Sequence, residues 1–286
     1  RSPDGPKPAS DARTSVAMPE RRRGGVQSLD RALDVLEALA ASRELGVSEV
    51  AARTGLVVST AHRLLAGLTH RGYVAQNPAN GRYQLGFKVL ELTGGLEVRT
   101  SPLRAAARPH LERVQQATSE TTNLVILDAD RVIYVDQVEG SHSVRMFTQL
   151  GRSALAHTTG SGKAILTYRP PEVIAKLYPR AREPLERLTP RTLTTLEALR
   201  DDFVRIRRRG YALDSEEHEI GVSCVATPVF DSTGFACGAI SISGPTARMD
   251  QADTRVLGRL LHRHAADISA ALGYRETPGS ARSSAV

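Results

Sequence analysis

Side chains that can bind DNA are grouped in residues 59–63, where four polar or charged residues occur within five positions. They are Ser59, Thr60, His62 and Arg63. Arginine can bind a guanine edge through two hydrogen bonds, and hydroxyl groups can bind phosphates or base edges. The apolar residues of this segment recur at helical spacing, as Ala61, Leu64, Leu65 and Leu68. The pattern therefore predicts an amphipathic helix, beginning near Ser59, whose polar face can reach DNA.

A second short helix is expected before this one, and a basic segment follows it. Gly55 separates the two helices, because glycine readily takes the left-handed conformation that ends a helix. Asn80-Gly81 is a favoured hairpin turn between two short strands, and Arg82 follows it. From Arg53 to Lys88 the chain has five Arg or Lys residues and no Asp or Glu. These features predict a winged helix-turn-helix with Arg82 on phosphate, in preference to a helical hairpin for protein contacts.

A glycine-rich segment, Gly160-Ser161-Gly162-Lys163-Ala164, is superficially similar to a phosphate-binding loop. That loop needs an earlier glycine where His157 stands and a Ser or Thr where Ala164 stands, so nucleotide hydrolysis is not expected. A helix that starts at glycines can still present free N–H groups to an anion. The alternative is that these glycines only begin a helix and bind no anion.

Ser241 and Ser243 alternate with Ile240 and Ile242 in an expected strand, so both hydroxyls project from one face. Taken alone, this pattern predicts a solvent-facing edge. Cys224 has no histidine beside it in a recognisable catalytic motif, and a buried structural thiol is the commoner state. His262 and His264 lie two residues apart on an expected helix and point to different faces, which makes them a poor metal pair.

Length and composition indicate two domains without a membrane span. The chain has 286 residues, 38 basic and 31 acidic, and a net charge of +7, which is compatible with a polyanionic partner. Only four of the basic residues are lysine, which suggests GC-rich bacterial coding. No apolar run reaches membrane-spanning length and the first residues are polar and proline-rich, so we expect a cytoplasmic protein. Two cysteines are too few for a disulfide scaffold or a cysteine-based zinc cluster.

Five segments are expected along the chain. Residues 1–25 form a disordered tail, 26–86 the winged helix-turn-helix, 87–102 a linker helix, 103–274 a second domain, and 275–286 another tail. A new helix is expected to start at Ser101-Pro102, since proline is tolerated in a first turn. The second domain should mix strands (residues 122–127, 132–138, 144–147, 224–230 and 237–243) with helices (162–168, 172–177, 193–209 and 252–272).

Six motifs occur in an order and spacing that resemble the IclR family of bacterial transcriptional regulators. They are residues 26–33, 59–65, 82–86, 160–166, 209–214 and 221–229, and the likeness extends over nearly all of residues 26–273. The resemblance implies an α+β protein: an N-terminal winged helix-turn-helix, a linker helix, and a C-terminal α/β effector-binding domain of profilin- or GAF-like shape.

The resemblance also implies partners and a site. The expected partners are double-stranded operator DNA of palindromic sequence, a second copy of the chain in a homodimer or homotetramer, and a small-molecule effector, often an aliphatic or aromatic acid. No cofactor is expected. A few members carry a structural metal, but no matching Cys/His cluster stands here, so none is expected. The family match directs Ser241 and Ser243 into the effector pocket, with these residues beside them: Met146, Gly160, Ser161, Asp214 and Cys224.

An enzyme with an appended nucleic-acid-binding domain is the alternative. No Ser-His-Asp order, paired-carboxylate motif or complete phosphate loop supports it, so we expect no enzymatic activity. Activators and repressors of the family share these motifs, so the motifs do not distinguish the two.

Overall fold

The computed structural model describes residues 26–146, 149–179 and 184–275, which divide into two compact units between Gly95 and Leu96. The tail expected at residues 1–25 lies outside the described residues, as does the one expected at 275–286 apart from its first residue.

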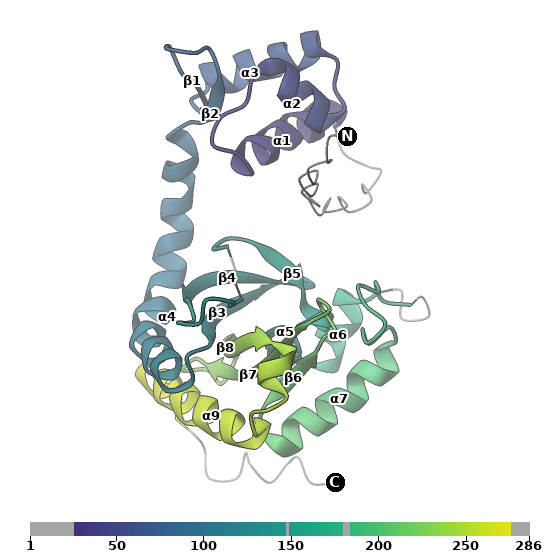
Figure 1. Ribbon diagram of the computed structural model, residues 1–286. Helices are drawn as coiled ribbons and strands as arrows, with labels where there is room; N and C mark the ends of the chain where they lie inside the picture. Colours follow the sequence, from purple (N-terminus) through teal and green to yellow (C-terminus); the bar gives the residue numbers. More distant parts are fainter. Residues whose placement is uncertain (1–25, 147–148, 180–183, 276–286) are drawn as a thin grey trace, which may run out of the picture. The chain divides into compact units, whose positions relative to one another are not determined.

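The described part of the first unit contains three helices and a hairpin, followed by the start of α4 (Lys88–Thr118) (Figure 1). Its elements are α1 (Gln27–Ala40), α2 (Val47–Thr54), α3 (Val58–His70), β1 (Val74–Gln76) and β2 (Tyr83–Leu85). The first turn of α2 is closed by Glu49, whose Oε2 accepts the Gly46 N–H at 2.6 Å. Gly55 ends this helix in the left-handed conformation, with φ of 67°. Leu45 forms two backbone hydrogen bonds with Tyr83, which joins the chain before α2 to the hairpin.

The hairpin is confirmed, but its turn is longer than the Asn80-Gly81 pair predicted. Asn77 and Arg82 form the last backbone pair, with the Asn77 N–H donating to the Arg82 carbonyl at 2.7 Å. The side chain of Asn77 accepts the Ala79 N–H at 2.9 Å, so the chain starts to turn at Asn77. Gly81 supplies the left-handed residue, with φ of 70°.

Helix α4 (Lys88–Thr118) crosses the division between the units and contains Pro102 and Pro109. The expectation that a linker helix ends near residue 102 and a new one begins is therefore wrong. A proline inside a helix removes one backbone hydrogen bond and strains the preceding turn. The second half of α4 is held nonetheless, because Leu103, Ala107 and Leu111 are buried against the sheet of the second unit.

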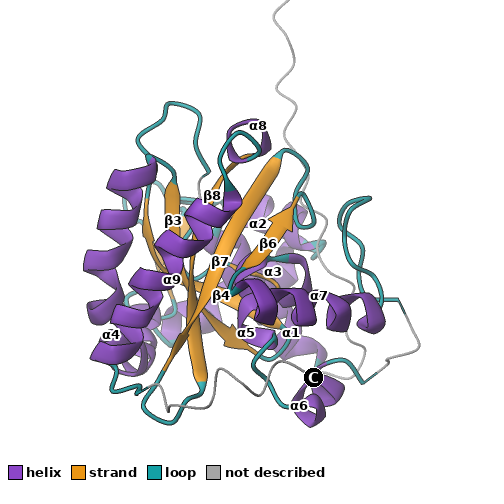
Figure 2. Cartoon of the chain, turned by 90° about the horizontal axis from the view of Figure 1, so that it is seen from below, coloured by secondary structure: helices purple, strands orange, loops and turns teal. Residues whose placement is uncertain are grey.

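The second unit is built on a six-stranded antiparallel sheet of order β5-β4-β3-β8-β7-β6. The strands are β3 (Thr121–Asp128), β4 (Arg131–Val138), β5 (Ser153–Leu155), β6 (Ala212–Ser215), β7 (Val222–Phe230) and β8 (Ala236–Pro245). The helices are α5 (Gly160–Leu166), α6 (Pro171–Leu177), α7 (Leu196–Arg209), α8 (Thr246–Met249) and α9 (Thr254–Ala271), with a 3-10 turn at Ala156–Thr158. Helices α4 and α9 cover one face of the sheet, and α5 and α7 lie on the other (Figure 2).

Four of the five predicted strands are confirmed. Residues 144–146 of the fifth form no strand, and Phe147 lies outside the described residues. The predictions missed β5 and β6, which have three and four residues, too few for a periodic signal. The four predicted helices exist with ends shifted by up to three residues, and α8 was not expected.

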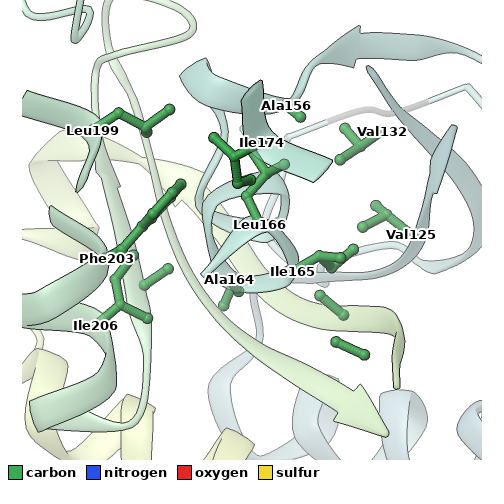
Figure 3. Packing of buried hydrophobic residues seen from close by; sticks show 14 of the residues in the cluster. Val125, Val132, Ala156, Ala164, Ile165, Leu166, Ile174, Leu199, Phe203 and Ile206 are labelled. Atoms are coloured by element: carbon green, nitrogen blue, oxygen red, sulfur yellow. The ribbon is translucent and has the colours of Figure 1, made fainter. Parts of the chain in front are cut away.

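Two hydrophobic cores lie on the two faces of this sheet. Strand β3 contributes to both, because Leu124 faces the core with α4 and α9 while Val125 faces the core with α5 and α7. Figure 3 shows the second of these, in which Phe203 and Ile206 of α7 lie near Ala164 and Leu166 of α5. The sheet is thus covered on both sides, and polar groups between sheet and helices must find partners within the fold.

Candidate functional site

Helix α3 presents the polar residues that the sequence assigns to DNA. Ser59, His62 and Arg63 are exposed and Thr60 is half-buried, while Ala61 and Leu65 are fully buried in the core of the first unit. The amphipathic pattern is thus confirmed. The exposed face carries hydroxyl, imidazole and guanidinium groups, all of which can donate hydrogen bonds to phosphates or bases.

Arg82 is held by a carboxylate that the sequence analysis overlooked. Its Nη2 lies 2.5 Å from Oε2 of Glu49 and donates to the Glu44 carbonyl at 3.3 Å. Glu44 also accepts hydrogen bonds from the side chains of Asn77 and Asn80, at 2.8 and 2.9 Å. Both glutamates precede the acid-free window of residues 53–88, but the fold brings them to the hairpin. Part of the positive charge of Arg82 is therefore already compensated.

A small cavity in the second unit lies beside the sheet, between β8, β7 and the start of α5. Its free space is about 20 Å³, roughly the room that one water molecule needs. It is lined by Tyr134, Met146, Thr159, Ser161, Asp214, His218, Val222, Cys224, Ser241 and Ser243.

Six of the seven residues predicted for an effector site line this cavity. The seventh, Gly160, does not line it but packs behind it, since a Cβ there would lie 3.3 Å from the Cys224 Sγ. Tyr134, Thr159, His218 and Val222 were not predicted. Tyr134 faces the cavity from a strand that the sequence located correctly, whereas His218 follows β6 in a turn without any periodic pattern.

The serine pair occupies the middle of the sheet. Ser241 lies between Asn123 of β3 and Ala226 of β7, and Ser243 lies between Thr121 and Cys224. Ser241 is only 1% exposed, so the solvent-facing alternative is wrong. The Asn123 side-chain amide donates to the Ser243 hydroxyl at 3.3 Å. Ile240 and Ile242 point to the opposite face, into the core with α4 and α9, as the alternation predicts.

Burial shifts the pKa of the ionisable groups in the cavity toward their neutral forms. Burial raises the pKa of Asp214 to about 7, helped by the nearby charge of Glu217 and opposed by the Glu217 N–H, which donates to Asp214 at 2.7 Å. Burial also raises the pKa of the Cys224 thiol to about 12 and lowers that of His218. A thiol with so high a pKa is a poor nucleophile, which argues against the catalytic reading of Cys224.

The glycines of α5 serve close packing. A Cβ on Gly162 would lie 2.2 Å from the Ala156 carbonyl oxygen, so only glycine fits. Thr159 caps this seven-residue helix by accepting the Gly162 N–H at 3.0 Å. The Gly162 amide is thus already bonded within the protein and is not free to meet an anion.

Lys163 is buried to 1% exposure and bound to two carboxylates. Its Nζ lies 2.6 and 2.7 Å from the two oxygens of Glu217 and 3.0 Å from Oδ2 of Asp202 on α7. The lysine of this segment is therefore committed to the protein's own acids. Burial raises the pKa of Glu217, and the charge of Lys163 opposes that rise.

A larger groove of about 570 Å³ lies elsewhere, between α7 and α9. Its lining includes Arg207, Arg208, Arg209, Arg259, His262 and Arg263. It is open and strongly basic, and it shares no residue with the cavity. Size alone would favour this groove for a ligand, but of the two spaces the cavity is the one that combines enclosure with converging polar groups.

Both units match known domains. Residues 28–78 match the IclR helix-turn-helix domain, and residues 96–270 match the domain described as bacterial transcriptional regulator IclR C-terminal. The chain belongs to the IclR family. As an IclR-family transcriptional regulator it has a DNA-binding domain and an effector domain, and the α+β fold class expected from the sequence is confirmed.

Relatives of known role share most of the length of this IclR-family chain. The regulator BhcR of Paracoccus denitrificans is 38% identical over 256 residues, which are 90% of this chain and 91% of BhcR. The transcriptional repressor IclR of Escherichia coli is 33% identical over 271 residues, 94% of this chain and 98% of the relative. Both relatives are named for a role in regulating transcription.

Solved structures agree. The IclR of Thermotoga maritima has a TM-score of 0.71 at 32% identity, covering 87% of this chain and 99% of that one. An IclR homologue of Microbacterium hydrocarbonoxydans, complexed with 4-hydroxybenzoate, has a TM-score of 0.70 at 28% identity, covering 86% of this chain and 98% of that one.

Among the described residues, no helix is long and apolar enough to cross a membrane.

Replacing Lys163 with Met should lower the free energy of unfolding by about 3–5 kcal/mol, because Glu217 and Asp202 would be left buried without their partner. Urea denaturation followed by circular dichroism measures this loss. Lys176→Met, on the exposed side of α6, is the control and should change stability by no more than about 0.5 kcal/mol. Equal stabilities for the two variants would show that the buried ion pairs do not hold this domain.

Proposed function

We propose that this IclR-family protein binds a palindromic operator through α3 and the β1–β2 hairpin, and that a small carboxylic acid in the cavity of the second unit changes operator affinity. This regulator would act on chromosomal DNA in the cytoplasm. The observation that carries the proposal is the cavity, where six residues that the family resemblance assigns to an effector site line one small space.

The DNA surface is the exposed face of α3. Arg63 supports base recognition, since its guanidinium is exposed and forms no ion pair in the described structure, and Thr60 and His62 stand beside it. Ser59 lies at the start of the helix, where a hydroxyl can bind phosphate. Arg82 is assigned to phosphate at the hairpin, in competition with Glu49.

A second copy of the chain is the expected partner, because one recognition helix covers too few base pairs to select an operator. Exposed apolar side chains on the first unit support this. Leu29 and Leu33 of α1 are 57% and 47% exposed, and Phe87, just before α4, is 88% exposed. Such groups on a DNA-binding unit fit an interface between copies, in a homodimer or a homotetramer.

The chemistry of the cavity favours a carboxylate. Ser241, Ser243 and the Ser161 hydroxyl are neutral donors, and Asp214 in its protonated form can donate as well. The bound 4-hydroxybenzoate of the Microbacterium homologue supports an aromatic hydroxy acid. Such a molecule is far larger than the 20 Å³ of free space, so the lining must move apart when it binds. Met146 is the lining side chain with the most rotatable bonds.

Replacing Arg63 with Ala should weaken operator binding by about 1–3 kcal/mol if Arg63 contacts a base edge. Arg82→Ala should weaken binding to all sequences and reduce the log-log salt slope by about one unit, because one phosphate contact is lost. Mobility-shift titrations over a range of salt concentrations measure both. Glu49→Gln distinguishes a phosphate contact of Arg82 from a purely structural role in the hairpin. Without the Glu49 charge the guanidinium is freed, so operator binding should strengthen if Arg82 contacts phosphate.

The opposite result, weaker binding in Glu49→Gln, would mean that the ion pair only braces the hairpin. If neither arginine variant binds operator more weakly than the unmodified protein, α3 is not the reading helix.

Removing both hydroxyls in a Ser241→Ala/Ser243→Ala variant should weaken binding of 4-hydroxybenzoate, used as a probe, by at least about tenfold, or 1.4 kcal/mol. Calorimetry measures the affinity, and operator titrations with and without the probe measure coupling, which must be reciprocal. Arg259→Ala, in the basic groove, is the control and should leave the affinity unchanged. A loss in Arg259→Ala alone would place the acid in the groove, and binding without any change in operator affinity would exclude an effector role.

Binding of this acid should weaken as pH rises through about 7, since Asp214 then loses the proton it donates and repels the carboxylate. Below this pH the affinity should level off. The other titratable groups around Asp214 are Glu217, His218, Tyr134, Cys224 and Lys163. Asp214→Asn keeps an acceptor for the Glu217 N–H but cannot ionise, so its affinity should not vary between about pH 6 and pH 8. An equally steep pH dependence in this variant would assign the proton to another group.

A further inference from the structure

A cluster of metal-binding side chains lies on the other side of the sheet, where α4 and α9 run side by side (Figure 2). His110 of α4 and His264 of α9 face each other with their Nδ1 atoms 2.9 Å apart. Asp267 stands one helical turn after His264, and one ligand atom from each of the three residues lies within 4.8 Å of the others. All three residues belong to the second unit.

Two Nδ1 atoms at this distance share a single proton, which one neutral ring donates to the other. When the donating ring changes tautomer, so that its proton is carried by Nε2 instead, both Nδ1 lone pairs are free and a cation can bind between them. Burial lowers the pKa of both histidines, which favours the neutral imidazole, the form that binds metals.

The geometry needs little adjustment. Two nitrogens that bind zinc at about 2.0–2.1 Å in a tetrahedral site lie about 3.3 Å apart, a few tenths of an ångström more than here. The rings are half-buried and the Asp267 carboxylate is exposed, so the carboxylate can turn toward a bound ion. Three protein ligands leave a fourth position for water, which is the pattern of an exchangeable site.

The charges around the cluster set its strength. Arg113 and Arg263 lie close enough to disfavour a positive charge on the histidines, and Asp267 acts in the opposite direction. Only one of these three charges favours a cation, so the site should be weaker than a closed structural zinc site and should respond to the concentration of free metal. Carboxylate and imidazole together suit zinc among the first-row divalent ions.

We infer that His110, His264 and Asp267 bind a zinc ion that fastens α4 to α9. The expectation of no metal rested on motifs along the chain, which cannot bring together two histidines that are 154 positions apart. It differs from the cavity and from the DNA surface in residues and in ligand. Since α4 starts in the first unit and is packed on the second, occupancy of the site should also affect how firmly α4 is held.

Zinc titration of the untagged full chain, stripped with a chelator, tests this inference. Calorimetry should show one saturable site per chain, and cobalt used in place of zinc should give a visible absorption band of a low-coordinate site. His110→Ala and His264→Ala should each abolish this binding. His262→Ala is the matched control: this histidine lies on the same helix, two positions away, and is absent from the cluster, so zinc binding should be unchanged.

Asp267→Asn guards against variants that fail to fold, because the side chain is exposed. It should weaken zinc binding by at least about tenfold while leaving the metal-free melting temperature unchanged. Zinc should raise the melting temperature of the unmodified chain but not of the histidine variants. The inference is overturned if the unmodified chain shows no saturable zinc site, or if His264→Ala binds zinc as tightly as the unmodified chain. It is also overturned if His262→Ala loses zinc binding as completely as His264→Ala.

Discussion

The buried charge of Lys163 fixes the arrangement on which the effector domain depends. Its ammonium joins α5 to Asp202 on α7 and to Glu217, which follows β6. Glu217 in turn donates its backbone N–H to Asp214, and Asp214 lines the cavity. A lysine cannot stay in such surroundings without both charge and hydrogen-bond partners. These two ion pairs therefore set the positions of α7 and of the turn after β6, and through the Glu217 N–H they also hold Asp214 at the cavity.

Much of the fold was accessible from the sequence where the patterns are long. The period of α3 placed Arg63 on an exposed face, and the alternation of β8 placed Ser241 and Ser243 on one face of the sheet, which the family resemblance assigned to the pocket. Local rules failed where tertiary contacts overrode them. Pro102 should end a helix, but burial of Leu103 and Leu111 carries α4 past it. Short strands such as β5 give no periodic signal at all.

The remaining residues of the two sites could not be predicted from the sequence, because their contacts are with residues distant in sequence. Arg82 looked unpaired, since its partner Glu49 lies 33 positions away. Met146, Asp214 and Cys224 were assigned through the family resemblance, and only the folded chain shows that they surround one space. His218 enters that space from a turn, where neither period nor motif marks it. The spacing of residues along the chain predicts helices and strands, whereas the fold determines which side chains contact one another.

The tightness of the cavity has a consequence for timing. A ligand that cannot enter until its walls separate binds no faster than they open, so its observed association rate should level off as ligand concentration rises. Once closed around the ligand, the same walls also slow its dissociation. A sensor built this way averages over brief fluctuations in metabolite level and responds to supplies that persist.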